Sequence, residues 1–375
     1  MIYLDSAATT IQKPPEVVAA MTNALSTMSS PGRGGYPAAV RAAETVFSCR
    51  EELAELFRLE NPERVVFTMN ATHGLNLAIK SLVGEGNRVV ISGYEHNAVT
   101  RPLTALKAKV VVAEAPLFHR QETVRAFERL VTPDTKAVVC THVSNVFGYI
   151  LPLEEIAALC RKRGVPLIID AAQSAGILPL SLRDTGAAFI AIPGHKGLFG
   201  PQGTGLLLCG RTPEPLLYGG TGSLSRSMQM PDFLPDRVEA GTQNIPGIAG
   251  LLSGLRFVQQ TGLRQIRRHE QLLLERLHQG LSACPGLQDY YGGPEVQTGV
   301  LSFRPAGEDC EALASKLSDG GFAVRAGLHC APTAHASAGT LETGTIRVSL
   351  SVLNSAAEAD AFGAYLQKIM SPGFF

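Results

Sequence analysis

The sequence lacks an excess of charge of either sign: its 375 residues include 33 basic and 33 acidic side chains. Without a net charge or a long run of one sign, the chain has no electrostatic basis for binding nucleic acid or an anionic membrane surface. No apolar run approaches the ~20 residues that a membrane span requires, and no basic and apolar leader opens the chain. We therefore expect neither a nucleic-acid partner nor membrane association.

The sequence also lacks the cysteine patterns of disulfide-rich and zinc-binding proteins. Its seven cysteines are odd in number and widely scattered, and no two form a C-x-x-C pair. Cys140, Cys160 and Cys209 lie in apolar runs and are expected to be small buried residues. We therefore predict no metal site and a reducing, cytoplasmic location.

Short apolar runs alternate with amphipathic stretches over much of the chain. Runs typical of buried strands lie near residues 64–68, 88–92, 109–113, 136–143, 165–170, 187–192 and 205–209. Stretches with helical spacing lie near 16–25, 38–57, 73–83, 97–107, 122–131 and 153–163. This alternation predicts an α/β fold with a mainly parallel, doubly wound sheet.

The remaining third of the chain has a different pattern. One helical stretch is expected from 248 to 287, followed by short strands and by helices near 309–318 and 355–370. This pattern predicts a smaller α+β domain at the C-terminal end. We expect a large domain of residues 15–255 and a small domain of residues 1–14 and 256–375.

Lys196 and Asp170 each follow a predicted strand, and the carboxyl ends of parallel strands meet at one crevice. A lysine surrounded by apolar chain loses its proton readily and becomes a nucleophilic amine. Such a pair suits pyridoxal phosphate, because the lysine binds the aldehyde as a Schiff base while the aspartate keeps the pyridine nitrogen protonated. Taken alone, Lys196 could equally be a solvated loop residue and Asp170 a helix cap.

Seven motifs in a fixed order favour the catalytic reading. They are YLDSAAT, THVSNVFG, IIDAAQSAG, GHKGLFGPQGTG, EAGTQN, VRAGLHCAP and TIRVSLS, and together they span nearly the whole chain. With these motifs the chain resembles class V (fold-type I) pyridoxal phosphate enzymes, most closely the cysteine desulfurase and selenocysteine lyase group. The resemblance implies the fold-type I architecture, with a seven-stranded sheet in the large domain.

The resemblance also indicates where the cofactor's phosphate binds. Ala71, Thr72 and His73 follow a predicted strand and open a helix, and a helix N-terminus suits a phosphate group, although Thr72 could be an ordinary cap. The resemblance assigns phosphate contacts to Thr72, His195 and Thr242. Because Thr242 is implied to reach in from a second subunit, a homodimer is expected.

One position departs from the pattern of the resembling family. Many members have a serine three residues before the lysine, where it donates to the phosphate, and this chain has Pro193. Proline has neither an N–H nor a hydroxyl group. We expect either one phosphate donor fewer or a replacement donor such as His73.

Three polar side chains near other strand ends complete the expected cofactor site. The resemblance implies that His96 stacks over the pyridine ring, with a possible acid–base role. It also implies that Asn145 donates to the cofactor's phenolic oxygen or to the substrate carboxylate, and that Gln173 lies near the same oxygen. Each of these side chains alone could instead stabilise a turn or cap a helix.

Substrate recognition and sulfur transfer are assigned to the C-terminal motifs. The resemblance implies that Arg347 binds the substrate α-carboxylate, a task for which the guanidinium fork is suited. It implies that Cys330 attacks the substrate sulfur and leaves as a persulfide. Arg325 and His329 precede Cys330, and nearby cationic or imidazole groups can lower the pKa of a thiol and make it a nucleophile. We expect Cys330 to lie in an exposed or mobile loop.

These observations predict a cysteine desulfurase that converts L-cysteine to L-alanine, with Lys196 as the proton-transferring base and acid. Selenocysteine remains an open alternative substrate. Another class V reaction, such as an aminotransferase reaction or a β-elimination, would leave Cys330 incidental. A catalytically weak scaffold that binds a sulfur-acceptor protein is an alternative of a different kind, and it predicts no cofactor absorbance. The sequence does not indicate which acceptor protein is used.

Overall fold

The seven predicted strands form one sheet in the computed structural model, which describes residues 1–32 and 34–371. The strand order is β2-β8-β7-β6-β5-β3-β4. All neighbours run parallel except at β8, which is antiparallel to both β2 and β7. The prediction of a mainly parallel, seven-stranded sheet is therefore confirmed. The strands are β2 (Val65–Thr68), β3 (Arg88–Ser92), β4 (Lys109–Ala113), β5 (Thr135–Thr141), β6 (Leu167–Asp170), β7 (Phe189–Pro193) and β8 (Gly205–Cys209).

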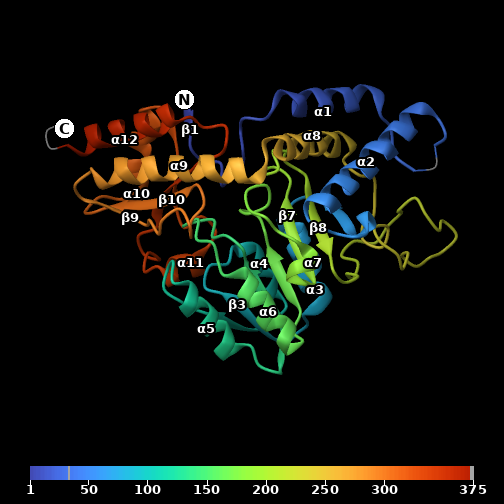
Figure 1. Ribbon diagram of the computed structural model, residues 1–375. Helices are drawn as coiled ribbons and strands as arrows, with labels where there is room; N and C mark the ends of the chain where they lie inside the picture. Colours follow the sequence, from blue (N-terminus) through green and yellow to red (C-terminus); the bar gives the residue numbers. More distant parts are fainter. Residues whose placement is uncertain (33, 372–375) are drawn as a thin grey trace.

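Helices cover both faces of this sheet (Figure 1). Successive strand residues point to opposite faces, so Val89 and Ile91 pack in one apolar core with α3 and α4, whereas Val90 packs in another with α2 and α6. Burial on both faces explains the apolar runs of all these strands except the edge strand β4, which is partly exposed. No described helix is both long enough and apolar enough to cross a membrane. The helices of this part are α1 (Pro15–Thr27), α2 (Pro37–Leu56), α3 (Ala71–Leu82), α4 (Asn97–Ala105), α5 (Arg120–Leu130), α6 (Leu153–Arg163) and α7 (Leu182–Thr185).

The C-terminal third forms a separate four-stranded sheet of order β12-β13-β10-β9. The N-terminal strand β1 (Ile2–Tyr3) pairs in parallel with β11 (Phe322–Ala323), which supports placing the first residues with the small domain. The division at 255/256 remains a prediction, and this point lies inside α8. The other elements are α8 (Ile245–Thr261), α9 (Leu263–Ser282), β9 (Leu287–Asp289), β10 (Val300–Pro305), α10 (Cys310–Asp319), β12 (Arg325–Gly327), α11 (Pro332–Ser337), β13 (Thr345–Ser349) and α12 (Ala356–Met370).

Two local expectations are wrong. The single helix expected over 248–287 is divided at Gly262, whose φ of 83° ends α8 and allows α9 to begin in a new direction. The segment after Cys330, expected to be a loop, forms the short helix α11. Pro332 is its first residue, a position that suits proline because no intrahelical N–H bond is required there.

Candidate active site

The ends of β5, β6 and β7 open into one cavity beside the N-termini of α3 and α4. The cavity is lined by residues from segments that are far apart in the sequence, as expected for the edge of a parallel sheet. The structure therefore brings most of the predicted site together. The predicted residues in its lining are Ala71, Thr72, His96, Asn145, Asp170, Gln173, His195 and Lys196.

Lys196 and Asp170 face this cavity in an electrostatic setting that favours a reactive amine. Burial lowers the pKa of Lys196 to about 8; the Asp170 carboxylate opposes this shift and the Arg347 guanidinium adds to it. Burial raises the pKa of Asp170, whereas a hydrogen bond from the Ala172 N–H (2.9 Å) and the charge of Lys196 favour its ionised form. The pair thus places a lysine that can be neutral near pH 8 beside a buried carboxyl group.

Close packing of two glycines fixes the position of the Lys196 turn. A Cβ on Gly176, which has a φ of 85°, would collide with the carbonyl group of Gly197. A Cβ on Gly197 would collide in turn with the carbonyl oxygen of Ala175. Only glycine permits this approach of the two turns, so the chain directly after Lys196 has little freedom.

His96 is the N-cap of α4 and faces the cavity as a neutral imidazole. Its Nδ1 accepts a hydrogen bond from the Ala98 N–H at 3.0 Å. Burial, together with the charge of Lys196, lowers the pKa of His96 to about 4. Because Nδ1 acts as an acceptor, the proton of the neutral ring lies on Nε2. The predicted stacking and acid–base roles of His96 remain predictions.

Residues from three segments surround the expected phosphate position. Thr72 is exposed in the first turn of α3, where helix geometry leaves N–H groups without intrahelical partners. The His195 ring is fixed by Nδ1···Thr9 Oγ1 at 2.9 Å. Pro193 also lines the cavity. His73 is absent from the lining, and its Nδ1 accepts from the Met69 N–H at 3.3 Å.

Lys13 was not predicted from the sequence, yet it lies beside His195. Its Nζ donates to the His195 carbonyl oxygen at 3.1 Å and to Thr10 Oγ1 at 2.5 Å. Burial lowers the pKa of Lys13 to about 8. Lys13 lies outside the motifs that carry the resemblance, and no local pattern marks it.

Asn145 and Gln173 line the cavity but also hold backbone groups. Asn145 Nδ2 donates to the His329 carbonyl oxygen at 2.8 Å. Gln173 Nε2 donates to the Ala7 carbonyl oxygen at 2.9 Å. Each side chain therefore connects the large sheet to a segment of the small domain, and their contacts with cofactor or substrate remain predictions.

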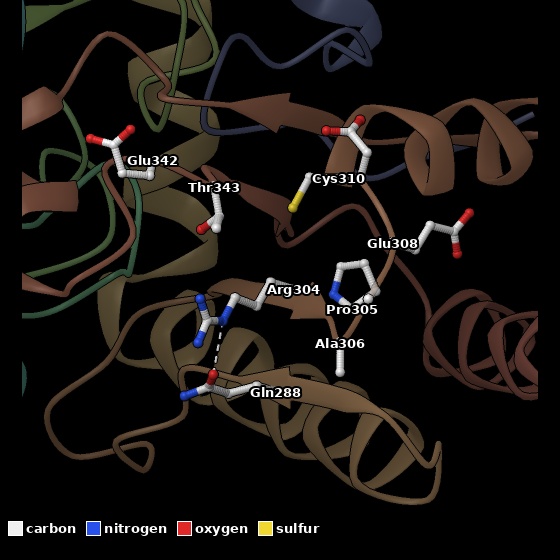
Figure 2. A pocket seen from close by; sticks show the side chains of 10 residues that line it. Gln288, Arg304, Pro305, Ala306, Glu308, Cys310, Glu342 and Thr343 are labelled. Atoms are coloured by element: carbon white, nitrogen blue, oxygen red, sulfur yellow. Dashed lines mark hydrogen bonds between the residues drawn. The ribbon is translucent and has the colours of Figure 1, made fainter.

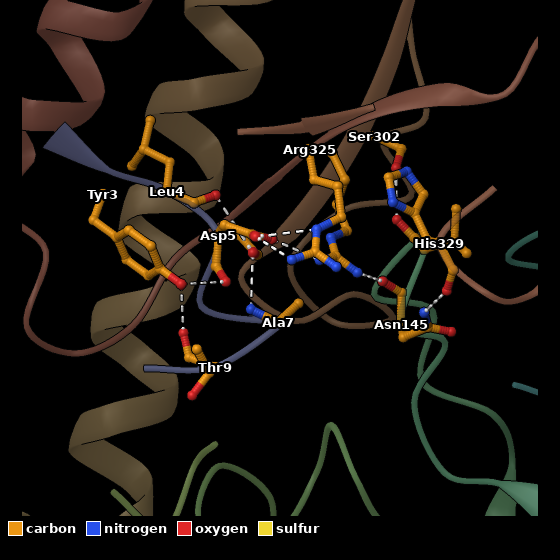
Figure 3. Close-up of polar contacts among 12 residues, drawn as sticks. Tyr3, Leu4, Asp5, Ala7, Thr9, Asn145, Ser302, Arg325 and His329 are labelled. Atoms are coloured by element: carbon orange, nitrogen blue, oxygen red, sulfur yellow. Dashed lines mark hydrogen bonds and ion pairs between the residues drawn. The ribbon is translucent and has the colours of Figure 1, made fainter. Parts of the chain in front are cut away.

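Arg347 lies in β13, is 2% exposed, is not among the residues that line the cavity, and is held by two partners. Its Nη2 pairs with Asp5 Oδ1 at 2.7 Å and its Nη1 donates to the Asn145 carbonyl oxygen at 2.9 Å. Figure 3 shows Asp5 beside Arg325, which pairs with Asp5 Oδ2 at 2.9 Å. Asp5 belongs to the motif YLDSAAT, but no local pattern in that motif indicates its partners.

Cys330 lies at an exposed turn that bonds to residues at the edge of the cavity, although Cys330 itself is not among the lining residues. The turn is held from both sides, because the Cys330 carbonyl oxygen accepts from the Asn97 N–H at 2.7 Å and that of His329 accepts from Asn145. His329 and Cys330 both adopt positive φ, at 49° and 56°. The other cysteines are buried free thiols, as expected for Cys140, Cys160 and Cys209.

The cationic groups expected next to Cys330 are engaged elsewhere. The His329 ring is buried, its Nε2 contacts the Thr345 carbonyl oxygen at 3.1 Å, and burial lowers the pKa of His329 to about 2. Arg325 pairs with Asp5. The His329 ring therefore stays neutral and lies next to Cys330 as an imidazole without a positive charge.

Thr242 lies outside the cavity, on an exposed segment between β8 and α8. The segment is anchored at Glu239, which forms a buried ion pair with Arg50 at 2.6 Å and accepts from the Phe67 N–H at 2.6 Å. The predicted contact of Thr242 with a phosphate on a second subunit remains a prediction.

A second cavity lies on the small domain, next to β10 and the start of α10 (Figure 2). Arg304, which donates to Gln288 Oε1 at 2.8 Å, and Cys310 are part of its lining. None of the predicted site residues lines this cavity. Its position away from the strand ends of the large sheet separates it from the active site.

The residues present fit pyridoxal phosphate. A buried amine at Lys196 can hold an aldehyde, and the Asp170 carboxyl group at the end of β6 can hold a protonated ring nitrogen. The first turn of α3 with Thr72, and the fixed ring of His195, supply donors for a phosphate group. These groups line one cavity, which is the arrangement that the cofactor requires.

Comparisons with known proteins agree with this fit. The family Aminotransferase class-V matches residues 2–362. A relative named "Probable cysteine desulfurase" from Methanothermobacter thermautotrophicus is 34% identical over 99% of this chain and 95% of its own length. A cysteine desulfurase structure from Thermococcus onnurineus is 30% identical, with a TM-score of 0.89 over 98% of this chain and 94% of its own. The structure of the cysteine desulfurase CsdA from Escherichia coli is 25% identical, with a TM-score of 0.85 over 99% of this chain and 95% of its own.

Proposed function

The chain belongs to the aminotransferase class-V family, and from that membership we propose that it is a pyridoxal phosphate-dependent cysteine desulfurase. It converts L-cysteine to L-alanine and retains the sulfur as a persulfide on Cys330. The observation that carries this proposal is the position of Cys330, an exposed thiol held beside the cavity of Lys196 and Asp170 by Asn97 and Asn145.

Each residue has a distinct part in the reaction. When bound, pyridoxal phosphate supplies an electron sink for the electrons released at the substrate α-carbon. Lys196 holds the cofactor and, as a neutral amine, moves the α-carbon proton. Asp170 keeps the ring nitrogen protonated, and Arg347 binds the substrate carboxylate.

Cys330 completes the reaction as the sulfur acceptor. Its thiolate attacks the substrate sulfur, and the bond between that sulfur and the substrate β-carbon breaks. The β-carbon then takes a proton to become the methyl group of L-alanine. Atoms balance, because L-cysteine and the Cys330 thiol give L-alanine and the Cys330 persulfide. Exposure of Cys330 leaves the persulfide accessible to a reductant or to a sulfur-acceptor protein.

A homodimer completes the proposal, with Thr242 reaching the phosphate of the second subunit. Large apolar side chains are exposed on α1, on α2 and on the segment between β8 and α8, which lie at the same edge of the molecule (Figure 1). Such a surface is typical of a subunit interface. Its members are Val18, Leu25, Val40, Phe47, Leu217, Tyr218, Leu224, Met228 and Phe233. We further place the enzyme in the cytoplasm, where reduced cysteines are maintained.

The test uses purified protein loaded with pyridoxal phosphate and supplied with L-cysteine and a thiol reductant. We expect alanine and sulfide in equal amounts, and a persulfide on Cys330 when the reductant is left out. Cys330→Ala should lower both products by ~10²-fold or more, because the sulfur acceptor is removed.

Cys310→Ala is the matched control, because it removes a buried cysteine of the small domain and should leave the products unchanged. Alanine formed at the wild-type rate by Cys330→Ala would contradict the role of Cys330. Turnover of L-selenocysteine but not of L-cysteine would reassign the substrate. Keto acid formation would favour an aminotransferase.

A further inference from the structure

In the described structure, the proposed carboxylate-binding arginine is already paired with a carboxylate of the protein. Arg347 Nη2 contacts Asp5 Oδ1 at 2.7 Å, and Asp5 Oδ2 contacts Arg325 Nη2 at 2.9 Å and Nε at 3.1 Å. We propose that Asp5 occupies Arg347 in the free enzyme, that the substrate carboxylate displaces it, and that Arg325 retains Asp5 when this occurs. The inference rests on the proposed function, in which Arg347 binds the substrate.

The two arginines are held close together by the small-domain sheet. Arg325 of β12 lies directly opposite Arg347 of β13 in the antiparallel pair. Residues opposite each other in such a pair share one face of the sheet, so their like charges repel. Asp5 pairs with both arginines, and Figure 3 shows its contact with Arg325. Without Asp5, the buried guanidinium of Arg347 would face a second cation with no counter-ion.

The charge of this cluster matches one further carboxylate. Two guanidinium groups and one carboxylate carry a net charge of one positive unit. Arg347 Nε is buried and has no hydrogen-bond partner among the described residues, so an N–H of the guanidinium is left to be satisfied. An amino acid substrate supplies one carboxylate, which makes the cluster neutral and can accept from Nε as well as Nη2.

Arg325 is suited to retain the displaced carboxylate. It already contacts Asp5 through both Nε and Nη2, the edge of the guanidinium that binds carboxylates in a bidentate manner. Its side chain is 52% exposed, whereas that of Arg347 is 3% exposed, so Arg325 is free to move with Asp5. Arg347 stays in place through its bond to the Asn145 carbonyl oxygen. Arg325 and Asp5 are thus positioning residues that tune carboxylate binding.

Steady-state kinetics of two single variants and their double variant test this inference. In Arg325→Gln, Asp5 has Arg347 as its only ion-pair partner, so KM for L-cysteine should rise ~10-fold, the scale of one charge-assisted hydrogen bond. The kcat should stay within ~2-fold of wild type, because the chemical step does not involve Arg325. Asp5→Asn removes the competing charge and should lower KM. In the double variant, Arg325→Gln should no longer raise KM above the value for Asp5→Asn alone.

Three controls separate this inference from a general structural effect. Arg304→Gln, which changes another arginine of the same sheet, should leave KM unchanged. Inhibition by cysteamine, which is cysteine without its carboxylate, should not differ between wild type and Arg325→Gln. Arg325→Lys keeps the charge without the fork and should give an intermediate KM, so the test does not depend on the folding of Asp5→Asn.

The outcomes distinguish the two proposals. If the wild-type enzyme forms no alanine from L-cysteine, the proposed function fails. If it forms alanine but Arg325→Gln leaves KM unchanged, the inference about Asp5 fails and the function stands. The inference would also be overturned if Arg325→Gln raised KM for L-cysteine equally in the wild-type and Asp5→Asn proteins. It would likewise be overturned if Arg325→Gln weakened inhibition by cysteamine as much as it raised KM.

Discussion

At the scale of single residues, the lowered pKa of Lys196 governs how the protein acquires its cofactor. Burial lowers this pKa to about 8, and only the neutral amine attacks an aldehyde. The rate at which cofactor-free protein binds pyridoxal phosphate should therefore rise with pH, with a midpoint near pH 8, and level off above it. Stopped-flow absorbance of the cofactor measures this rate.

Lys13 has to be excluded as the source of that pH dependence, because burial also lowers its pKa to about 8. The same measurement on Lys13→Gln should keep the midpoint near pH 8, whereas Lys196→Ala should abolish covalent binding. A rate that continued to rise toward the ordinary pKa of a lysine would show that Lys196 is not shifted.

The residue scale also shows which parts of the site the sequence could predict. Lys196 and Asp170 are found from their own neighbours, because Asp170 ends a strand and Lys196 lies just beyond one, and both strands are recognisable by their apolar residues. The pairing of Asp5 with Arg347 joins positions 342 residues apart. No local pattern encodes such a contact, so the Asp5–Arg347 pair could only be found in the structure.

At the scale of the elements, helix α4 depends on His96 for its N-cap. Substitutions of His96 can therefore separate its structural role as a cap from a catalytic role of its ring. His96→Ala should lower the free energy of unfolding by ~1 kcal/mol, because the cap bond to the Ala98 N–H is lost. His96→Asn restores a capping acceptor and should keep the stability. Both variants should lower kcat by ~10²-fold if the ring takes part in proton transfer.

Urea unfolding and steady-state kinetics of the same preparations provide both readouts. A kcat that recovered in His96→Asn along with the stability would reduce His96 to a helix cap. Equal stability of the two variants would show that the hydrogen bond to Ala98 contributes nothing to the fold.

Elements were predicted well wherever their pattern is strong. Apart from the edge strand β4, the strands of the large sheet have continuous apolar runs because both of their faces are buried. The break between α8 and α9 was missed because the apolar spacing continues across Gly262, and only the positive φ of that residue separates the helices. Helix α11 was missed because its six residues are too few for a helical period to be recognised.

At the scale of the whole molecule, the proposed dimer can be tested at one exposed leucine. Leu25 of α1 is 73% exposed and belongs to the apolar surface formed with α2 and the segment that carries Thr242. Leu25→Glu places a charge in the interface and should dissociate the dimer at micromolar concentration. The enzymatic activity should fall when the dimer dissociates, because Thr242 would no longer reach the phosphate bound by the second subunit.

Light scattering coupled to size-exclusion chromatography measures the mass directly. Leu272→Glu, at a residue of α9 with 53% exposure and outside that surface, is the matched control and should leave the mass unchanged. A wild-type protein that elutes as a monomer would overturn the dimer.

Pairing of β1 with β11 joins Ile2 to Phe322, and this has a consequence for biosynthesis. At a translation rate of ~5–20 residues per second, the first residues leave the ribosome roughly 16–60 s before their partner strand. Asp5, and with it the counter-ion of Arg347, is therefore set in place only after nearly all of the chain has been made. The large sheet can form earlier, so a nascent chain can present the Lys196 pocket before it can recognise a substrate carboxylate.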